Sequence, residues 1–327
     1  MKQTIIPELG REYIEPDEAS DTAAIIDAIK ERLSKEYPGK ILRQFHAKMH
    51  GCVKATFTVL ADIPQNFQHG FLVPGKSYEA IIRFSNGNTK VADDRKADLR
   101  GMAIKLLNVE GEMLQQDKDH PQSQDFLLVS HPTLMSSTVK QFRKNIEAIC
   151  KGALGLVIFS LNPANWPTVF RTLQSMKKCG SILNLQYYSV SPFRLHAADV
   201  AVKYAAAPVS NTAIPIKKHK NFLREEMSQR LSADSVIFDF MVQLQEDPVE
   251  MPIEDACKEW KSSWHKVATI EIPPQQFDNA QQDAFGENLS FSPWHCLKEH
   301  QPLGGISRAR KATYEAIANF RLEKNRS

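Results

Sequence analysis

The sequence predicts an α+β protein built on an eight-stranded antiparallel β-barrel, with a helical insert and a helix near the C-terminus. Three observations favour this class: two groups of short strand-like runs, a helical stretch between them, and an alanine-rich helical pattern near the end of the chain. No repeat and no Gly/Ser-rich linker divides the 327 residues. We expect a single domain over 1–327, consisting of an arm and helix (1–40), a barrel with its insert (41–275) and a C-terminal helical region (276–327).

The strand-like runs come in two sets of four. Each run is short, rich in apolar or β-branched residues, and bounded by Pro, Gly or Asn, which is typical of strands. The runs are 52–60, 77–84, 101–107, 125–129, 185–190, 198–206, 235–244 and 266–272. Two sets of four strands around a helical insert favour an antiparallel barrel or a curled sheet.

Four segments carry the expected helices. Residues 18–36 place apolar side chains near helical spacing and start with acidic residues, which favours a helix. The others are 136–178, 219–231 and 304–324. Two glycines precede the last helix, and Ser307 is its expected N-cap.

Composition narrows the function classes. The formal net charge of +3 is too small to argue for nucleic acid or an anionic membrane as a partner. Five scattered cysteines without a CxxC pair suggest neither a disulfide framework nor a zinc site and suit a reducing compartment. No secretory h-region and no run long enough to span a membrane is present, so we expect a cytoplasmic protein.

The strongest chemical signal lies on the C-terminal helix. Helical geometry places Arg310, Tyr314 and Arg321 within about 40° of one another on a single face. A phenolate is a good iron ligand, and an Arg one turn earlier stabilises it by charge and hydrogen bonding. A second planar guanidinium is suited to pair with a carboxylate. Taken alone, the same pattern also fits a surface helix with scattered cations.

The stretch FSPWHCLKEHQPLGGISRARKATY resembles the proximal region of short proteins of the catalase superfamily. The RxxxY pattern of haem catalases falls on Arg310 and Tyr314, and the arginine seven residues later falls on Arg321. The resemblance implies a catalase-like barrel that binds haem b (iron protoporphyrin IX). It also implies that Tyr314 is the iron ligand and that Arg310 and Arg321 bind the cofactor.

Three boxes in the N-terminal half extend the resemblance in the same order as in catalases. RQFHAKMHG resembles the distal-histidine segment and implies His46 as catalytic residue and Arg43 as a propionate partner. RFSN resembles the catalase RFST box, which implies Arg83 as a second propionate partner and Ser85 as a hydrogen-bond partner of His46. DLRGMAIK matches a third box, in which Arg100 is equally well explained by a structural role in the barrel.

Two departures from the catalase pattern concern the distal side. The catalase asparagine that helps to orient peroxide falls on or next to Gln122, whose amide is the expected replacement. The residue before the distal histidine is Phe45, where catalases have a small valine. If the Phe45 ring points into the pocket, access to the haem changes.

The resemblance implies a haem-dependent peroxidase or catalase that decomposes hydrogen peroxide or organic hydroperoxides. His46 would act as the distal base and then as acid. Two alternatives are an isomerase of fatty-acid hydroperoxides and a haem carrier without enzymatic activity. The expected partners are a small peroxide and an organic electron donor, with no nucleic acid. The chain ends soon after the last helix, which suggests a small homo-oligomer such as a dimer.

Overall fold

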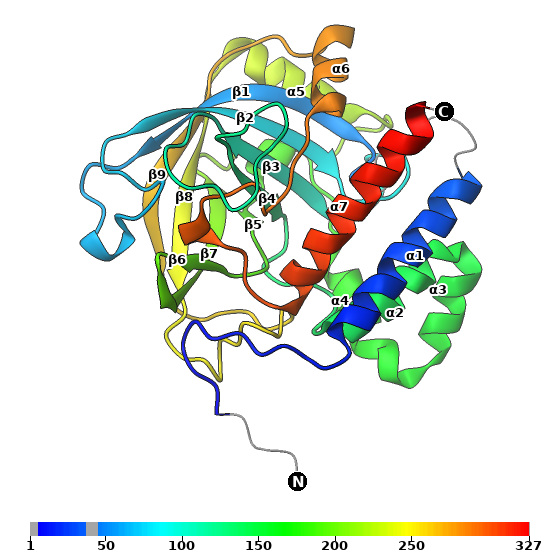
Figure 1. Cartoon of the computed structure of the whole chain (residues 1–327). Coiled ribbons are helices and arrows are strands. Elements are labelled where there is room, and N and C mark those ends of the chain that lie inside the picture. The colour runs from blue at the N-terminus through cyan, green and yellow to red at the C-terminus, as the bar shows by residue number, and fades with distance from the viewer. Residues whose placement is uncertain (1–5, 37–44, 327) are drawn as a thin grey trace.

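The computed structural model describes residues 6–36 and 45–326, without the side chains of 321, 322, 325 and 326. A barrel occupies one side of the molecule, and a layer of helices flanks it on the other (Figure 1). The strands are β1 Met49–Val59, β2 Ser77–Asn86, β3 Arg100–Leu106, β4 Gln124–Val129, β5 Tyr187–Tyr188, β6 Phe193–Leu195, β7 Ala197–Pro208, β8 Val236–Leu244 and β9 Trp264–Ile272.

The barrel is antiparallel and closed by eight strands. The order along the sheet is β5-β4-β3-β2-β1-β9-β8-β7-β6, and β5 also pairs with β7. That second pairing closes the barrel and leaves β6 attached outside the ring of eight. The eight-stranded antiparallel prediction is therefore confirmed, with each predicted strand close to an observed one and β6 as an addition.

The interior of the barrel is filled by side chains. Alternate residues of each strand point inward, as the twofold period of a strand requires. The aromatic rings of Phe57, Phe71, Phe126, Tyr204 and Phe240 contact one another at the centre, with neighbouring centroids 5.0–6.4 Å apart. Because these rings fill the centre of the barrel, a site for a large flat ligand must lie on its outer surface.

Helices α1–α4 and α7 lie on one side of this barrel, and α5 and α6 lie against β1 (Figure 1). Their bounds are α1 Glu18–Glu36, α2 Val139–Cys150, α3 Gly152–Leu161, α4 Trp166–Ser175, α5 Phe222–Ala233, α6 Ala280–Asn288 and α7 Gly305–Arg326. Short 3-10 turns lie at Gln65–Phe67, Pro163–Asn165, Ile182–Asn184 and Lys298–His300. The expected helical segments all contain helices, and the insert between β4 and β5 divides into α2, α3 and α4.

Helix α7 starts two residues earlier than the expected cap. It begins at Gly305, so Ser307 lies inside its first turn, which corrects the N-cap assignment. Its start is instead held by carboxylates: the Gly305 N–H donates to Glu254 Oε2 at 2.7 Å. Arg308 forms ion pairs with Glu12, Glu18 and Glu254, which tie α7 to the N-terminal segment.

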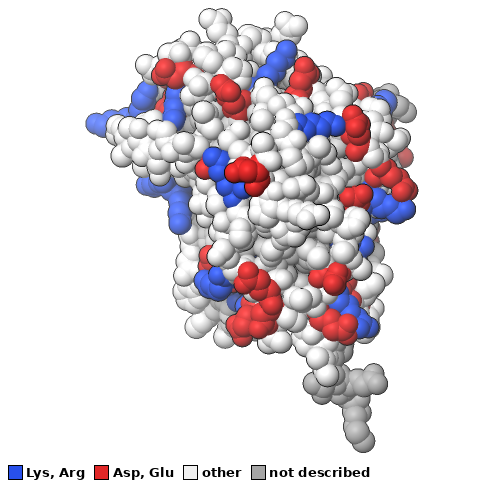
Figure 2. Space-filling model, turned by 90° about the vertical axis from the view of Figure 1, so that its left-hand side faces the viewer, with Lys and Arg blue, Asp and Glu red and all other residues white. Residues whose placement is uncertain are grey.

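The surface of the barrel side carries both signs of charge. Figure 2, which views the molecule from that side, shows lysines and arginines interspersed with aspartates and glutamates. Among the described residues, no helix has the length and hydropathy of a transmembrane span.

Candidate functional site

His46 lies just before β1, where the backbone takes an unusual conformation. Its φ is +58°, a left-handed value that is uncommon for a residue other than glycine. The ring lies against the backbone of Gly101 on β3, where an added Cβ would come within 2.6 Å of its Nδ1 and Cε1 atoms. Only glycine leaves room for the imidazole at this point.

A second contact sets the direction of the His46 ring. Its Nδ1 lies 2.9 Å from Ser85 Oγ on β2, and a hydroxyl can serve as donor or acceptor there. Ser85 pairs with Gly101 in the β2–β3 ladder, so the two residues that hold the imidazole are direct neighbours. The structure therefore brings together His46 and Ser85, as the sequence predicts.

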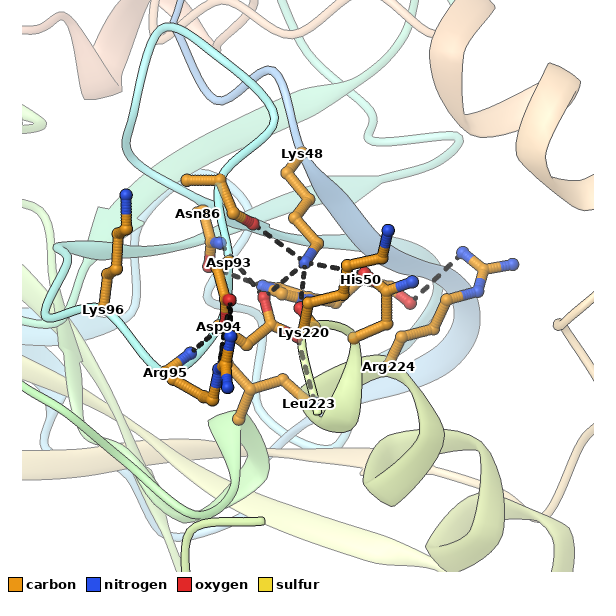
Figure 3. Close-up of polar contacts among 12 residues, drawn as sticks. Lys48, His50, Asn86, Asp93, Asp94, Arg95, Lys96, Lys220, Leu223 and Arg224 are labelled. Carbon is orange, nitrogen blue, oxygen red and sulfur yellow. Dashed lines mark hydrogen bonds and ion pairs between the residues drawn. The ribbon is translucent and has the colours of Figure 1, made fainter. Parts of the chain in front are cut away.

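A buried polar network anchors the chain directly after His46 (Figure 3). The Lys48 ammonium donates to Asp94 Oδ1 at 2.6 Å, to the Lys220 carbonyl at 2.8 Å and to the Ala92 carbonyl at 3.0 Å. Asp94 is fully buried and also accepts from the Leu223 N–H at 3.2 Å. A buried charge pair with its remaining positions satisfied holds its segments in one arrangement.

His50 and Arg100 complete the same network from β1 and β3. His50 Nε2 lies 2.6 Å from Asn86 Oδ1, and Arg100 donates to that oxygen as well. Because burial disfavours the charged imidazole, the pKa of His50 is lowered to about 4. Arg100 also donates to the Lys96 carbonyl at 3.1 Å and is almost fully buried. These contacts support its structural role in the barrel.

Arg83 links the His46 segment to α6. Its Nη2 donates to the His46 carbonyl at 3.1 Å and to Glu287 Oε1 at 2.9 Å. Arg83 is 3% exposed, and its Nε has no hydrogen-bond partner among the described residues. A buried guanidinium with an unused donor can accept a further anionic group. Arg43, the other predicted propionate partner near His46, lies outside the described residues.

The predicted iron ligand and its arginine meet on α7. Arg310 Nη2 donates to the Tyr314 hydroxyl oxygen at 3.0 Å, and its guanidinium carbon lies 5.5 Å from the ring centroid of the tyrosine. Both side chains are half-buried. The backbone of Arg321 belongs to the same helix, but its side chain lies outside the described residues.

Phe45 packs with helices. It is half-buried and lies against an apolar cluster that includes Ile29 of α1, Ile146 of α2 and Ile306 of α7. The ring therefore stabilises the contact between the His46 segment and the helical layer.

The structure brings Gln122 into no described contact with His46, so its role on the distal side stays a prediction. Gln122 lies beyond the end of β4 where Gln124 pairs with Leu106, whereas His46 lies on Gly101. Five residues of extended strand between Gly101 and Leu106 correspond to roughly 17 Å. Gln122 is exposed and lines an open surface hollow with residues 108–111. The sequence could not show this, because the length of the turn between β3 and β4 decides it.

One buried cluster was missed from the sequence. Lys105 donates to Asp125 at 2.8 Å and to Asp117 at 3.2 Å, and His295 Nδ1 lies 3.1 Å from Asp125 and 3.2 Å from Asp117. The two carboxylates and the imidazole have the spacing of a metal site, but the Lys105 ammonium already supplies a cation to them. The cluster ties the segment before α7 to β3 and β4, and residues so distant in sequence give no local signal.

Solved structures of catalases resemble this chain in overall fold. A fungal catalase matches with a TM-score of 0.70 and 16% identity, over 88% of this chain and 61% of its own. Catalase A from Saccharomyces cerevisiae matches with a TM-score of 0.69 and 15% identity, over 98% of this chain and 68% of its own. The chain has a catalase-like fold.

The catalase-like fold confirms the family resemblance noted from the sequence at the level of architecture. This chain spans less than two thirds of the fungal catalase. No family model and no curated protein matches the sequence.

Proposed function

We propose that this catalase-like chain is a haem-dependent peroxidase or catalase, with Tyr314 as the iron ligand and His46 as the distal acid and base. The single observation that carries the proposal is the Arg310–Tyr314 hydrogen bond of 3.0 Å on a helix beside the barrel. An arginine that donates to a phenol oxygen stabilises the phenolate, which is the form that binds iron.

The residues present fit a haem group. The donor set includes a phenol paired with a guanidinium, and the buried Arg83 has an unused Nε donor next to the His46 carbonyl. The outer face of the barrel beside His46 carries small residues, Gly101 and the half-buried Ala103. A flat ligand can approach the backbone closely where side chains are small, and the Arg83 Nε can donate a hydrogen bond to a propionate.

The protein side chains would divide the work between binding and proton transfer. Bound haem would supply the redox chemistry with peroxide. Tyr314 would bind the iron, Arg310 would stabilise the Tyr314 phenolate, and Arg83 would bind a propionate. His46 would take a proton at an imidazole nitrogen from the incoming peroxide and return it to the departing oxygen. Ser85 would keep the ring in orientation through Nδ1.

Haem titration followed by absorption spectroscopy tests the proximal assignment. We expect the loaded protein to show a high-spin ferric tyrosinate spectrum, and Tyr314→Phe to lose it while remaining folded. Tyr13→Phe is the matched control, because Tyr13 lies in the N-terminal segment and its hydroxyl donates to the Ile6 carbonyl. A wild-type protein that retains no haem would exclude the proposal.

Activity assays then separate the reaction classes. Oxygen release from hydrogen peroxide indicates a catalase, and oxidation of an organic donor without oxygen release indicates a peroxidase. Conversion of a fatty-acid hydroperoxide to a rearranged product, with neither of those signals, would instead indicate the isomerase alternative. Bound haem without any turnover would indicate a carrier.

A further inference from the structure

The helical insert carries an apolar surface that the rest of the described chain leaves uncovered. On α3, Leu154, Ile158 and Leu161 recur at i, i+4 and i+7, and on α4 Trp166, Phe170 and Leu173 do the same. All six side chains are between 50% and 74% exposed. This spacing places each set on one face of its helix, and in a globular protein such a face normally packs into the core.

The packing of α3 explains why its outer face remains open. Only Gly155 and Phe159 of this helix are buried, and an added Cβ at Gly155 would come within 2.5 Å of the Ala148 carbonyl on α2. The Trp166 indole N–H donates to the Ser160 carbonyl at 3.0 Å, so the apolar face of α4 begins beside the end of α3. In Figure 1, α3 lies at the outer edge of the helical layer, away from the barrel.

The charges of this insert are almost all positive. Residues 138–178 contain seven basic residues and one acidic residue, although the whole chain has a net charge of only +3. The single acid, Glu147, is paired with Arg143 at 2.7 Å. The exposed charged side chains are lysines: Lys140, Lys144, Lys151, Lys177 and Lys178, of which Lys140 lies 3.9 Å from Asp17 of the N-terminal segment. On the barrel side, in contrast, both signs are interspersed (Figure 2).

We propose that α3 and α4 form a docking surface for an anionic lipid bilayer, with the six apolar side chains inserted at the interface and the lysines among the headgroups. Exposed apolar residues with an interfacial Trp and flanking lysines are the features of helices that lie on membranes. Helix α3 is about 15 Å long, half the thickness of the hydrocarbon layer, so it lies on the surface and does not cross.

Charge complementarity selects the bilayer over a second copy of the chain. A twofold contact through this surface would bring two copies of the same net-positive patch together, which charge repulsion disfavours. An anionic lipid surface offers the opposite charge to the lysines that have no acidic partner in the insert, and this attraction falls off within a Debye length. The inference is independent of the proposed haem chemistry, because it uses no residue of that site.

Vesicle binding tests the proposal on the full chain, with or without haem. We expect co-sedimentation with vesicles of phosphatidylcholine and phosphatidylserine, weaker binding to pure phosphatidylcholine, and loss of binding as salt is raised. Ile158→Ser with Phe170→Ser should reduce binding at least tenfold. Val249→Ser is the matched control, because Val249 is equally exposed but lies outside the insert.

Charge reversal tests the electrostatic part. Lys144→Glu with Lys151→Glu should reduce binding to the anionic vesicles by more than tenfold, at roughly fivefold for each lysine removed. Lys144→Arg with Lys151→Arg should retain it. Trp166 fluorescence should shift to the blue on binding, and Trp166→Phe should remove that shift.

Two outcomes would overturn the inference. The first is equal or absent binding to both kinds of vesicle. The second is a concentration-dependent dimer that Ile158→Ser with Phe170→Ser dissociates, without vesicle binding, which would assign the surface to a second copy. Because circular dichroism can confirm that these surface variants are folded, neither outcome can be attributed to misfolding.

Discussion

The two sides of the proposed haem site are built in different ways. On the distal side, His46 is held by Gly101 and Ser85 from two strands, and the residues after it enter a buried network around Lys48 and Asp94. On the proximal side, Arg310 and Tyr314 meet within one turn of one half-exposed helix. The position of the His46 ring therefore depends on packing between strands of the barrel, whereas Arg310 and Tyr314 come together as soon as α7 forms.

Replacing the distal imidazole is expected to have the largest effect. His46→Gln should reduce peroxide turnover by about a thousandfold while haem remains bound, because general acid–base catalysis contributes on that order. Steady-state oxygen release or donor oxidation checks the rate, and the absorption spectrum checks the haem. His219→Gln, on the exposed segment before α5, is the control. Unchanged turnover in His46→Gln would argue for a carrier.

Breaking the buried network next to His46 is expected to have the second-largest effect, on the free energy of unfolding and not on turnover. Asp94→Ala leaves the Lys48 ammonium buried without its partner, and such losses are about 3 kcal/mol of unfolding free energy. Urea unfolding measures this. Asp93→Ala removes the neighbouring carboxylate, which pairs with the exposed Arg95, and should have a much smaller effect. Equal losses in the two variants would show that the network does not anchor the segment.

Acidification should weaken the same side of the site. The pKa of His50 is lowered from 6.5 to about 4, so between these values the unfolded chain binds a proton that the folded chain does not. The contribution of His50 to stability is therefore full above pH 6.5 and falls as the pH is lowered towards 4, by about 2 kcal/mol from pH 7 to pH 5.

Urea unfolding at the two pH values measures the change. His50→Gln keeps a donor for Asn86 and removes the titration, so the difference between pH 7 and pH 5 should shrink by about that amount. His219→Gln, whose imidazole is exposed, should leave the difference as it is. An identical pH dependence in wild type and His50→Gln would contradict the assignment to His50. His300, whose pKa burial lowers to about 3, contributes in the same direction in both proteins.

The smallest expected effect concerns the proximal arginine. Arg310→Gln should weaken haem binding about fivefold, which corresponds to about 1 kcal/mol for a charge-assisted hydrogen bond that solvent partly screens. Haem titration checks this, and Arg310→Lys should keep part of the affinity because it retains the charge. If Arg310→Gln bound no haem at all, haem binding on the proximal side would depend on Arg310 far more than a single partly screened hydrogen bond allows.

The barrel and the helices were largely predictable from the sequence. Strand alternation and helical periodicity are local patterns, and they predicted all eight barrel strands and the segments that contain the main helices. The position of Gln122 relative to His46 was not predictable in the same way, because it depends on the register at a strand end, which the sequence pattern does not define. The net charge of +3 gave no sign of the positively charged insert, because a total over the chain hides local charge.

The sequence by itself determined the eight barrel strands, the main helical segments and the face of α7 that carries Arg310 and Tyr314, since helix geometry alone brings those two residues together. Only the tertiary structure decided that Gly101 makes room for the His46 ring, that Lys105 joins two aspartates and His295, and that the apolar faces of α3 and α4 remain exposed. The reason is that backbone periodicity is set by neighbours in the chain, whereas burial and charge pairing are set by whatever segments pack against them.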